Sequence, residues 1–295
     1  ALEVEPGEVL VLSSDPITGT VKDIGSHCIH ITANDLAASG AEPLGVMLTV
    51  LLPEEVEEPE IRHMVQEAEE TCRSLDMEIL GGHTEITRVV SQPLISVTGI
   101  GKIRREALLT PAGIHPGMDL VISKWIGLEA TSILAKEREE MLTQRFSPEF
   151  IRTAREFSRY LSVVPDARAA RTAGAAAMHD ITEGGVFGAF WEMASAGGVG
   201  LEIDLRAIPI RQETVEICEF FGVNPYQIMS SGSMLIAAED GQAVVRALKD
   251  AGIPGTVVGR TTASNARILR NKEEIRYLDK PQPDELYRAL EVKKL

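Results

Sequence analysis

The residues best suited to chemistry lie in the segment 81–87, where two adjacent glycines precede an imidazole, a hydroxyl and a carboxylate. Adjacent glycines allow the backbone to take positive φ values and to approach a ligand closely. His83 and Glu85 are candidate catalytic residues, because both groups can serve as general acid, general base or metal ligand. A polar turn that follows a strand is the alternative, and the Gly-Gly pair alone does not decide between the two.

Three aspartates follow or interrupt apolar and small-residue segments, namely Asp15, Asp35 and Asp180. An unpaired charge is costly in such surroundings, which favours a functional role over a surface role. Mg²⁺ prefers oxygen ligands from one or two carboxylates together with substrate phosphates. These aspartates are therefore candidate ligands of Mg²⁺. A helix cap or a solubilising loop residue is the alternative, and capping applies above all to Asp180, because Thr182 and the glycines at 184–185 follow it.

Other common site types are not favoured. His27, Cys28 and His30 are close in sequence, but on a helix they spread over more than one face and no second cluster completes a zinc site. The chain has no P-loop, no dinucleotide-binding glycine fingerprint after a first strand, no zinc-protease motif and no serine-hydrolase elbow. Any nucleotide must be held in another way.

Composition bounds the class of protein. The chain has 295 residues with 44% hydrophobic and 25% charged residues, as expected of a soluble globular protein of about two domains. The formal net charge of −15 argues against a nucleic-acid partner, because such binding needs basic patches. Three widely spaced cysteines form no disulfide framework, and no apolar run is long enough to span a membrane. A cytoplasmic location is expected.

Alternating strand and helix patterns predict two α/β or α+β domains, 1–108 and 109–295, separated by a cluster of prolines and glycines. In the first domain, strands are expected at 9–12, 43–52, around 79 and 94–103, and helices at 23–40 and 59–75. The strand around Ile79 is expected to be brief and to deliver Gly81 and Gly82 as a loop. In the second domain, helices are expected at 128–142, 148–161 and 166–178, with another that begins at 184–185.

Taken in order, the motifs resemble those of the aminoimidazole ribonucleotide synthetase (PurM) superfamily, and most closely its hydrogenase-maturation HypE-type members. The resemblance covers nearly the whole chain. It rests on Ser-Ser-Asp at 13–15, Asn-Asp-Leu-Ala-Ala-Ser-Gly-Ala-Glu-Pro-Leu at 34–44, Gly-Gly-His-Thr-Glu at 81–85, His-Asp-Ile-Thr-Glu-Gly-Gly at 179–185 and Ser-Ser-Gly-Ser-Met-Leu at 230–235. The eleven-residue string that begins at Asn34 is the most specific of these.

The resemblance implies an ATP- and Mg²⁺-dependent enzyme that activates an acceptor, either a small molecule or a protein-derived group, by phosphoryl transfer. It also implies a homodimer in which the N-terminal domains pair into a β-barrel, with the nucleotide in a cleft near the interface. Metal and phosphate contacts are implied for Asp15, Asp35 and Asp180. Nucleotide contacts are implied for Asn34, Gly81, Gly82, Thr84, Gly184 and Gly185.

The sequence also departs from the family pattern. His83 stands where many relatives have aspartate or glutamate, and Glu85 is the nearest carboxylate that would replace it. HypE proteins end in a motif with a reactive cysteine, whereas no cysteine follows Cys218 in this sequence. A catalytically silent paralogue that binds nucleotide as a sensor or serves as a maturation scaffold is therefore the alternative function. A nucleotide-free structural dimer is the third.

Overall fold

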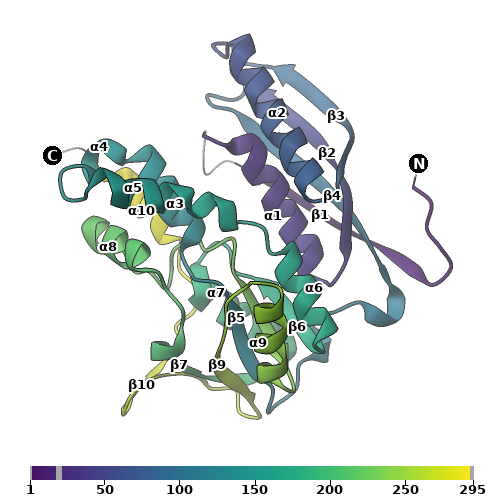
Figure 1. Ribbon diagram of the computed structural model, residues 1–295, viewed down its shortest axis with the longest axis vertical. Helices are drawn as coiled ribbons and strands as arrows, with labels where there is room; N and C mark the ends of the chain where they lie inside the picture. The colour runs from purple at the N-terminus through teal and green to yellow at the C-terminus, as the bar shows by residue number, and fades with distance from the viewer. Residues whose placement is uncertain (1, 18–21, 293–295) are drawn as a thin grey trace. The chain divides into compact units, whose positions relative to one another are not determined.

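The computed structural model describes residues 2–17 and 22–292 (Figure 1). The chain forms two compact units, Ala1–Leu108 and Leu109–Leu295, each with its own β-sheet. The protein is thus a mixed α/β chain of two units.

Unit 1 is a four-stranded sheet in the order β1-β4-β2-β3. Its strands are β1 (Glu8–Ile17), β2 (Glu42–Leu52), β3 (Glu78–Ile86) and β4 (Leu94–Arg104). Strand β4 pairs antiparallel with β1 and β2, and β2 pairs parallel with β3. Strands β1 and β3 are therefore the two edges of the sheet.

Two helices cover one face of this sheet, α1 (Ile24–Ala38) and α2 (Glu58–Ser74). Helix α1 buries its apolar side chains against β4 and its neighbours, with Ile29 and Leu36 fully buried. The packing is close enough to require glycine at Gly99, where a Cβ would lie 2.3 Å from the Thr32 Cγ2 atom. No helix in the described part of unit 1 covers the opposite face of the sheet, and Leu12 and Met47 are exposed there.

Unit 2 contains a seven-stranded sheet in the order β11-β10-β7-β9-β5-β8-β6. The strands are β5 (Asp119–Ser123), β6 (Ala175–Asp180), β7 (Gly200–Asp204), β8 (Met234–Ala238), β9 (Gly255–Thr262), β10 (Arg267–Asn271) and β11 (Glu274–Tyr277). The helices are α3 (Leu128–Glu137), α4 (Glu139–Leu142), α5 (Pro148–Arg155), α6 (Val164–Thr172), α7 (Gly185–Gly197), α8 (Gln212–Phe221), α9 (Gly241–Asp250) and α10 (Glu285–Glu291).

The helices of unit 2 pack in three groups (Figure 1). Helices α6 and α9 pack together against strands of the sheet, whereas α7 belongs to a core cluster that includes Leu120, Ile122 and Phe190. A second core cluster joins α3, α4, α5, α8 and α10. Strand β8 runs antiparallel to β5 and β6, so the C-terminal ends of β5 and β6 lie beside the N-terminal end of β8. The loops at these strand ends carry most of the candidate site residues of the unit.

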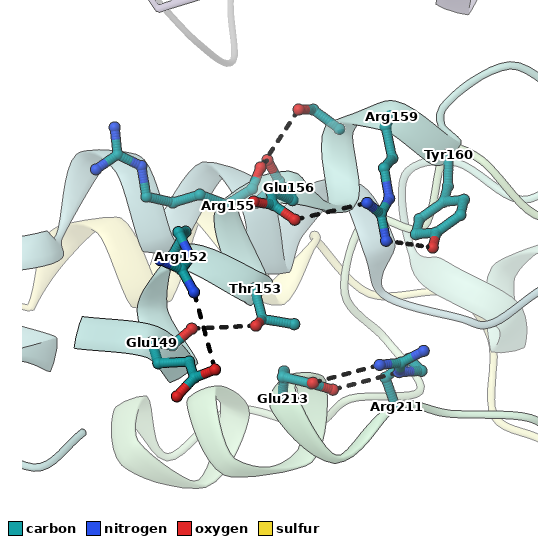
Figure 2. A network of polar contacts seen from close by, with 11 residues as sticks. Glu149, Arg152, Thr153, Arg155, Glu156, Arg159, Tyr160, Arg211 and Glu213 are labelled. Carbon is teal, nitrogen blue, oxygen red and sulfur yellow. Dashed lines mark hydrogen bonds and ion pairs between the residues drawn. The ribbon is translucent and has the colours of Figure 1, made fainter. Parts of the chain in front are cut away.

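Ion pairs line the surface formed by α5, the 3₁₀ turn Glu156–Tyr160 and the start of α8 (Figure 2). Arg159 pairs with Glu156 at 3.5 Å, and Arg211 pairs with Glu213 at 3.3 Å. The Arg211 guanidinium also lies 5.0 Å from the centroid of the Trp125 ring. The two arginines are thus engaged with neighbours in the same unit, and we assign this surface a packing role.

Several boundaries differ from those expected. The segment 81–85 is not a loop but part of β3, whose hydrogen bonds to β2 continue to Ile86. The helix expected over 166–178 ends at Thr172, because Gly174 takes a φ of 88° and the following residues form β6 beside β8. Strand β1 continues past Asp15 to Ile17. Strands β10 and β11 and helix α10 were not predicted.

Within the described ranges, none of the helices has the length and apolar character needed to cross a membrane.

Candidate functional site

Two of the predicted metal ligands meet in unit 1. The Ser13 hydroxyl donates a hydrogen bond of 2.6 Å to the Asp35 carboxylate and lies 3.2 Å from a carboxylate oxygen of Asp15. Ser13 and Asp15 alternate with exposed residues along β1, so both face helix α1, which carries Asp35. Both aspartates are half-buried. The fold therefore places two carboxylates beside one hydroxyl on the helix-covered face of the sheet.

The composition of this pair suits magnesium. Mg²⁺ is usually bound by one or two carboxylates, with phosphate and water oxygens completing its shell. Among the described residues, no group of three or more His, Cys, Asp or Glu side chains is arranged to hold a metal. A two-carboxylate site that is completed by a substrate's phosphates fits both facts. Asn34, the predicted nucleotide contact next to Asp35, is fully buried within α1.

Strand β3 carries the predicted Gly-Gly-His-Thr-Glu motif in an extended conformation. Gly82 has to be glycine, because a Cβ there would lie 1.9 Å from the Leu48 carbonyl oxygen, whereas a Cβ at Gly81 would meet nothing within 4 Å. His83 and Glu85 lie two residues apart on the same face, with 3.5 Å between the imidazole Nε2 and a carboxylate oxygen. Both are largely exposed, as is Thr84.

Strand register places His83 and Asp15 on opposite faces of the sheet. Asp15 pairs with Val97, which is fully buried on the helix-covered face. His83 pairs with Thr49, and Thr49 pairs with Ser96, the residue that precedes Val97. Directly paired residues point to the same face and successive residues to opposite faces. Because β1 and β3 are also opposite edges, one copy of unit 1 does not bring His83 and Glu85 to the two aspartates.

In unit 2, Asp180 is the last residue of β6 and is buried. The loop 182–185 follows it and is tied to the segment 230–233, because the Ser230 N–H donates to the Thr182 carbonyl and the Ile181 N–H donates to the Ser233 carbonyl. Gly185 has a φ of 62°, and a Cβ there would lie 2.7 Å from the Tyr226 carbonyl. Glycine is thus needed for the loop to pass this close to its neighbour.

The amides of the loop already have partners within the protein. The Gly184 N–H donates to the Asp284 carboxylate at 2.7 Å, and the Gly185 N–H donates to the Thr182 carbonyl at 3.1 Å. The nucleotide contacts that the resemblance implies for Gly184 and Gly185 stay a prediction. In this structure the two glycines shape the turn from β6 into α7.

Two buried carboxylates near this loop were not predicted. Glu129, in the first turn of α3, is almost completely buried, and burial, together with the charges of Asp284 and Asp180, raises its pKa to about 7. Asp284 precedes α10 and is also buried, which raises its pKa. In the sequence, Glu129 follows an apolar strand and the residues Ile-Gly-Leu. Asp284 follows a proline at the start of a helix. Neither pattern distinguishes a site residue from a helix terminus.

The His179 side chain connects the end of β6 to helix α7. Its Nε2 atom lies 2.9 Å from a Glu192 carboxylate oxygen on α7, and its Nδ1 atom lies 2.6 Å from the Asp180 carbonyl. Burial alone would lower the pKa of His179, but the Glu192 carboxylate and the charge of Asp180 outweigh it and the pKa is raised. His179 therefore links β6 to α7 next to the predicted site residue Asp180.

Comparisons with known proteins place the chain in a family. A model of the N-terminal domain of AIR synthase related proteins matches residues 1–103, and a model of the C-terminal domain matches residues 115–270. Carbamoyl dehydratase HypE of Rhodobacter capsulatus is 27% identical over 278 residues, covering 90% of this chain and 79% of the relative. A putative hydrogenase expression/formation protein of Methanocaldococcus jannaschii is 26% identical over 251 residues, covering 84% and 72%.

Solved structures agree with this assignment. HypE of Escherichia coli superimposes with a TM-score of 0.80 at 25% identity, covering 94% of this chain and 87% of that one. A HypE structure in complex with ATP shares the fold, with a TM-score of 0.82 at 19% identity and coverages of 98% and 89%. Two matched domains in the expected order, over most of the sequence, support the same conclusion as the motifs: the chain belongs to the family of AIR synthase related proteins, within the PurM superfamily and similar to its HypE proteins.

Proposed function

We propose that this protein is an ATP- and Mg²⁺-dependent enzyme that activates an acceptor by phosphoryl transfer. The observation that carries the proposal is the Asp15–Ser13–Asp35 arrangement, in which two carboxylates converge on one hydroxyl. Relatives described as carbamoyl dehydratases, and a HypE solved with ATP, support a nucleotide-dependent reaction. The acceptor is a small molecule or a protein-derived group.

Each predicted residue has a role in this proposal. Asp15 and Asp35 hold Mg²⁺, which neutralises charge on the transferred phosphoryl group when it is bound. Asn34 keeps the end of α1 in place beside Asp35. Asp180, in unit 2, contacts Mg²⁺ or phosphate in this proposal. On β3, the backbone of Gly81, Gly82 and Thr84 contacts the nucleotide. His83 and Glu85 act as general base and general acid toward the acceptor. Gly184 and Gly185 shape the turn that follows Asp180.

We further propose that the enzyme acts as a homodimer in the cytoplasm. The uncovered face of the unit 1 sheet exposes Leu10, Leu12 and Met47, and every residue of the edge strand β3 is exposed. An open edge with apolar neighbours requires a cover. A second copy that closes the two sheets into a barrel covers both features and brings β3 of one copy beside β1 of the other. In that arrangement the strand that carries His83 and Glu85 lies next to the strand that carries Asp15 in the other copy.

Calorimetric titration of the protein with ATP, with and without Mg²⁺, tests the proposal. Binding that requires Mg²⁺ and weakens in both Asp15→Asn and Asp35→Asn supports it. ATP binding without any turnover in the presence of candidate acceptors would favour the catalytically silent sensor or scaffold, which the exposed His83 at the expected acidic position motivates. Absence of ATP binding would contradict both functions.

A further inference from the structure

The C-terminal helix α10 is tied to the loop that follows Asp180 through one side chain. Asp284 precedes α10 and is 3% exposed. Its Oδ1 atom accepts from the N–H of Leu286 at 2.8 Å, which caps the helix, and from the N–H of Met229 at 3.2 Å. Its Oδ2 atom accepts from the N–H of Gly184 at 2.7 Å. One carboxylate thus joins three segments that are far apart in the sequence.

Helix capping alone does not require this arrangement. An N-cap side chain needs only one oxygen for the helix it begins, and Asp240 at the start of α9 shows the ordinary case, with a single N-cap bond of 2.9 Å to the N–H of Ala243. Asp284 directs its second oxygen away from α10 to Gly184. Charge-assisted bonds to backbone amides are among the stronger hydrogen bonds in proteins, so this oxygen holds the turn between β6 and α7.

Other contacts hold α10 against the same segments. The Glu285 N–H donates to the Gln227 carbonyl at 3.2 Å, and the Arg288 guanidinium donates to the Gly222 carbonyl at 2.6 Å. Leu286 and Ala289 are fully buried in the helical core cluster. The helix is therefore a fixed part of unit 2, and Asp284 is the point where it meets the candidate site.

We propose that Asp284 is a positioning residue, which uses the docked helix α10 to set the conformation of the loop 182–185 and, with it, the placement of Asp180. The proposal rests on the proposed function in one respect, because ligand binding at Asp180 is part of that function. The restraint on the loop stands independently of the ligand.

The structure suggests an unusually specific variant. In Asp284→Asn, the remaining carbonyl oxygen can keep the bonds to Leu286 and Met229, while the new amide group faces the N–H of Gly184 and cannot accept from it. Asparagine is also a good N-cap, so α10 keeps its start. Asp240→Asn is the matched control, because it changes the same group at the start of a helix whose N-cap bond stays within that helix.

Two measurements on the full chain decide the question. Hydrogen–deuterium exchange of a peptide that covers 181–186 is expected to be about tenfold faster or more in Asp284→Asn, since the loss of one charge-assisted bond typically has an effect of this size. The dissociation constant for Mg²⁺-ATP is expected to rise about tenfold, in line with the loosened loop. Asp240→Asn is expected to change neither quantity.

Other outcomes would overturn the proposal. Unchanged exchange at 181–186 would show that Asp284 does not restrain the loop. Faster exchange with unchanged ATP affinity would reduce Asp284 to a packing residue, and tighter ATP binding would show that its carboxylate obstructs the site. If the unmodified protein binds no ATP, the proposed function fails, and the exchange rates still decide whether Asp284 restrains the loop.

Discussion

The Ser13 hydroxyl and the Asp35 carboxylate, 22 positions apart in the sequence, form a hydrogen bond of 2.6 Å, and the same hydroxyl lies 3.2 Å from Asp15. Strand β1 and helix α1 thus contribute to one polar site. We expect Asp35→Asn to lower ATP turnover at least about 100-fold, because the metal loses one of two carboxylates where charge develops. Phosphate release measures the effect. Glu69→Gln, an exposed acid on α2, is the control and should leave turnover unchanged. Equal turnover in the two variants would contradict the metal assignment.

The uncovered face of the unit 1 sheet provides a test of the homodimer. Leu12 is 64% exposed in the centre of β1, whereas Val89 is 81% exposed outside the sheet. We expect Leu12→Glu to shift the protein from dimer to monomer in sedimentation velocity, because it buries a charge at the proposed interface. Val89→Glu should sediment like the unmodified protein. Dimers that persist in Leu12→Glu would show that this face is not the interface.

Neighbouring glycines in β3 are expected to differ in their tolerance of alanine. In Gly82→Ala the added Cβ would overlap the Leu48 carbonyl, so β3 must separate from β2, and we expect a loss of about 3 kcal/mol or more in the free energy of unfolding. In Gly81→Ala the site is open, and only the positive φ opposes the substitution, at about 1 kcal/mol. Urea unfolding curves measure both values. Equal losses would show that β3 does not lie this close to β2.

Glu129 predicts a specific dependence of stability on pH. Its pKa is raised to about 7 in the folded protein, so the folded state holds a proton that the unfolded chain releases above its ordinary pKa. The contribution of this proton to stability is complete below pH 4.5 and is lost as pH rises through about 7. In Glu129→Gln, which cannot ionise, the decline in melting temperature between pH 5 and pH 8 should be smaller than in the unmodified protein. Parallel pH profiles for the two proteins would contradict the raised pKa.

Part of this architecture can be predicted from sequence. Apolar periodicity identified helix α2 and strands β2 and β4, because each buries one face of a regular element. It failed over 166–178, where alanines suit a helix as well as the strand beside β8 that tertiary pairing selects. The Gly-Gly pair at 81–82 suggested a loop, but here glycine serves the close approach of two strands.

The candidate site was likewise predictable from the sequence only in part. Charged residues in apolar surroundings pointed to Asp15, Asp35 and Asp180, because the cost of burying a charge is visible in the sequence. The hydrogen bond from Ser13 to Asp35 depends on the pairing of β1 with β4 and on the packing of α1 against the sheet. It could not be predicted from the sequence. The partners of Asp284 lie 55 and 100 positions away, so its role depends on tertiary structure alone.

The exposed strand β3 also bears on how the protein must be handled and how a cell must produce it. All nine of its residues face solvent in a single chain, so a newly made or diluted copy presents an open template to any extended peptide. The strand that carries His83 and Glu85 is therefore also a site at which aggregation can begin. Mutations that weaken its cover should lower the yield of folded protein before they alter the chemistry at the aspartates.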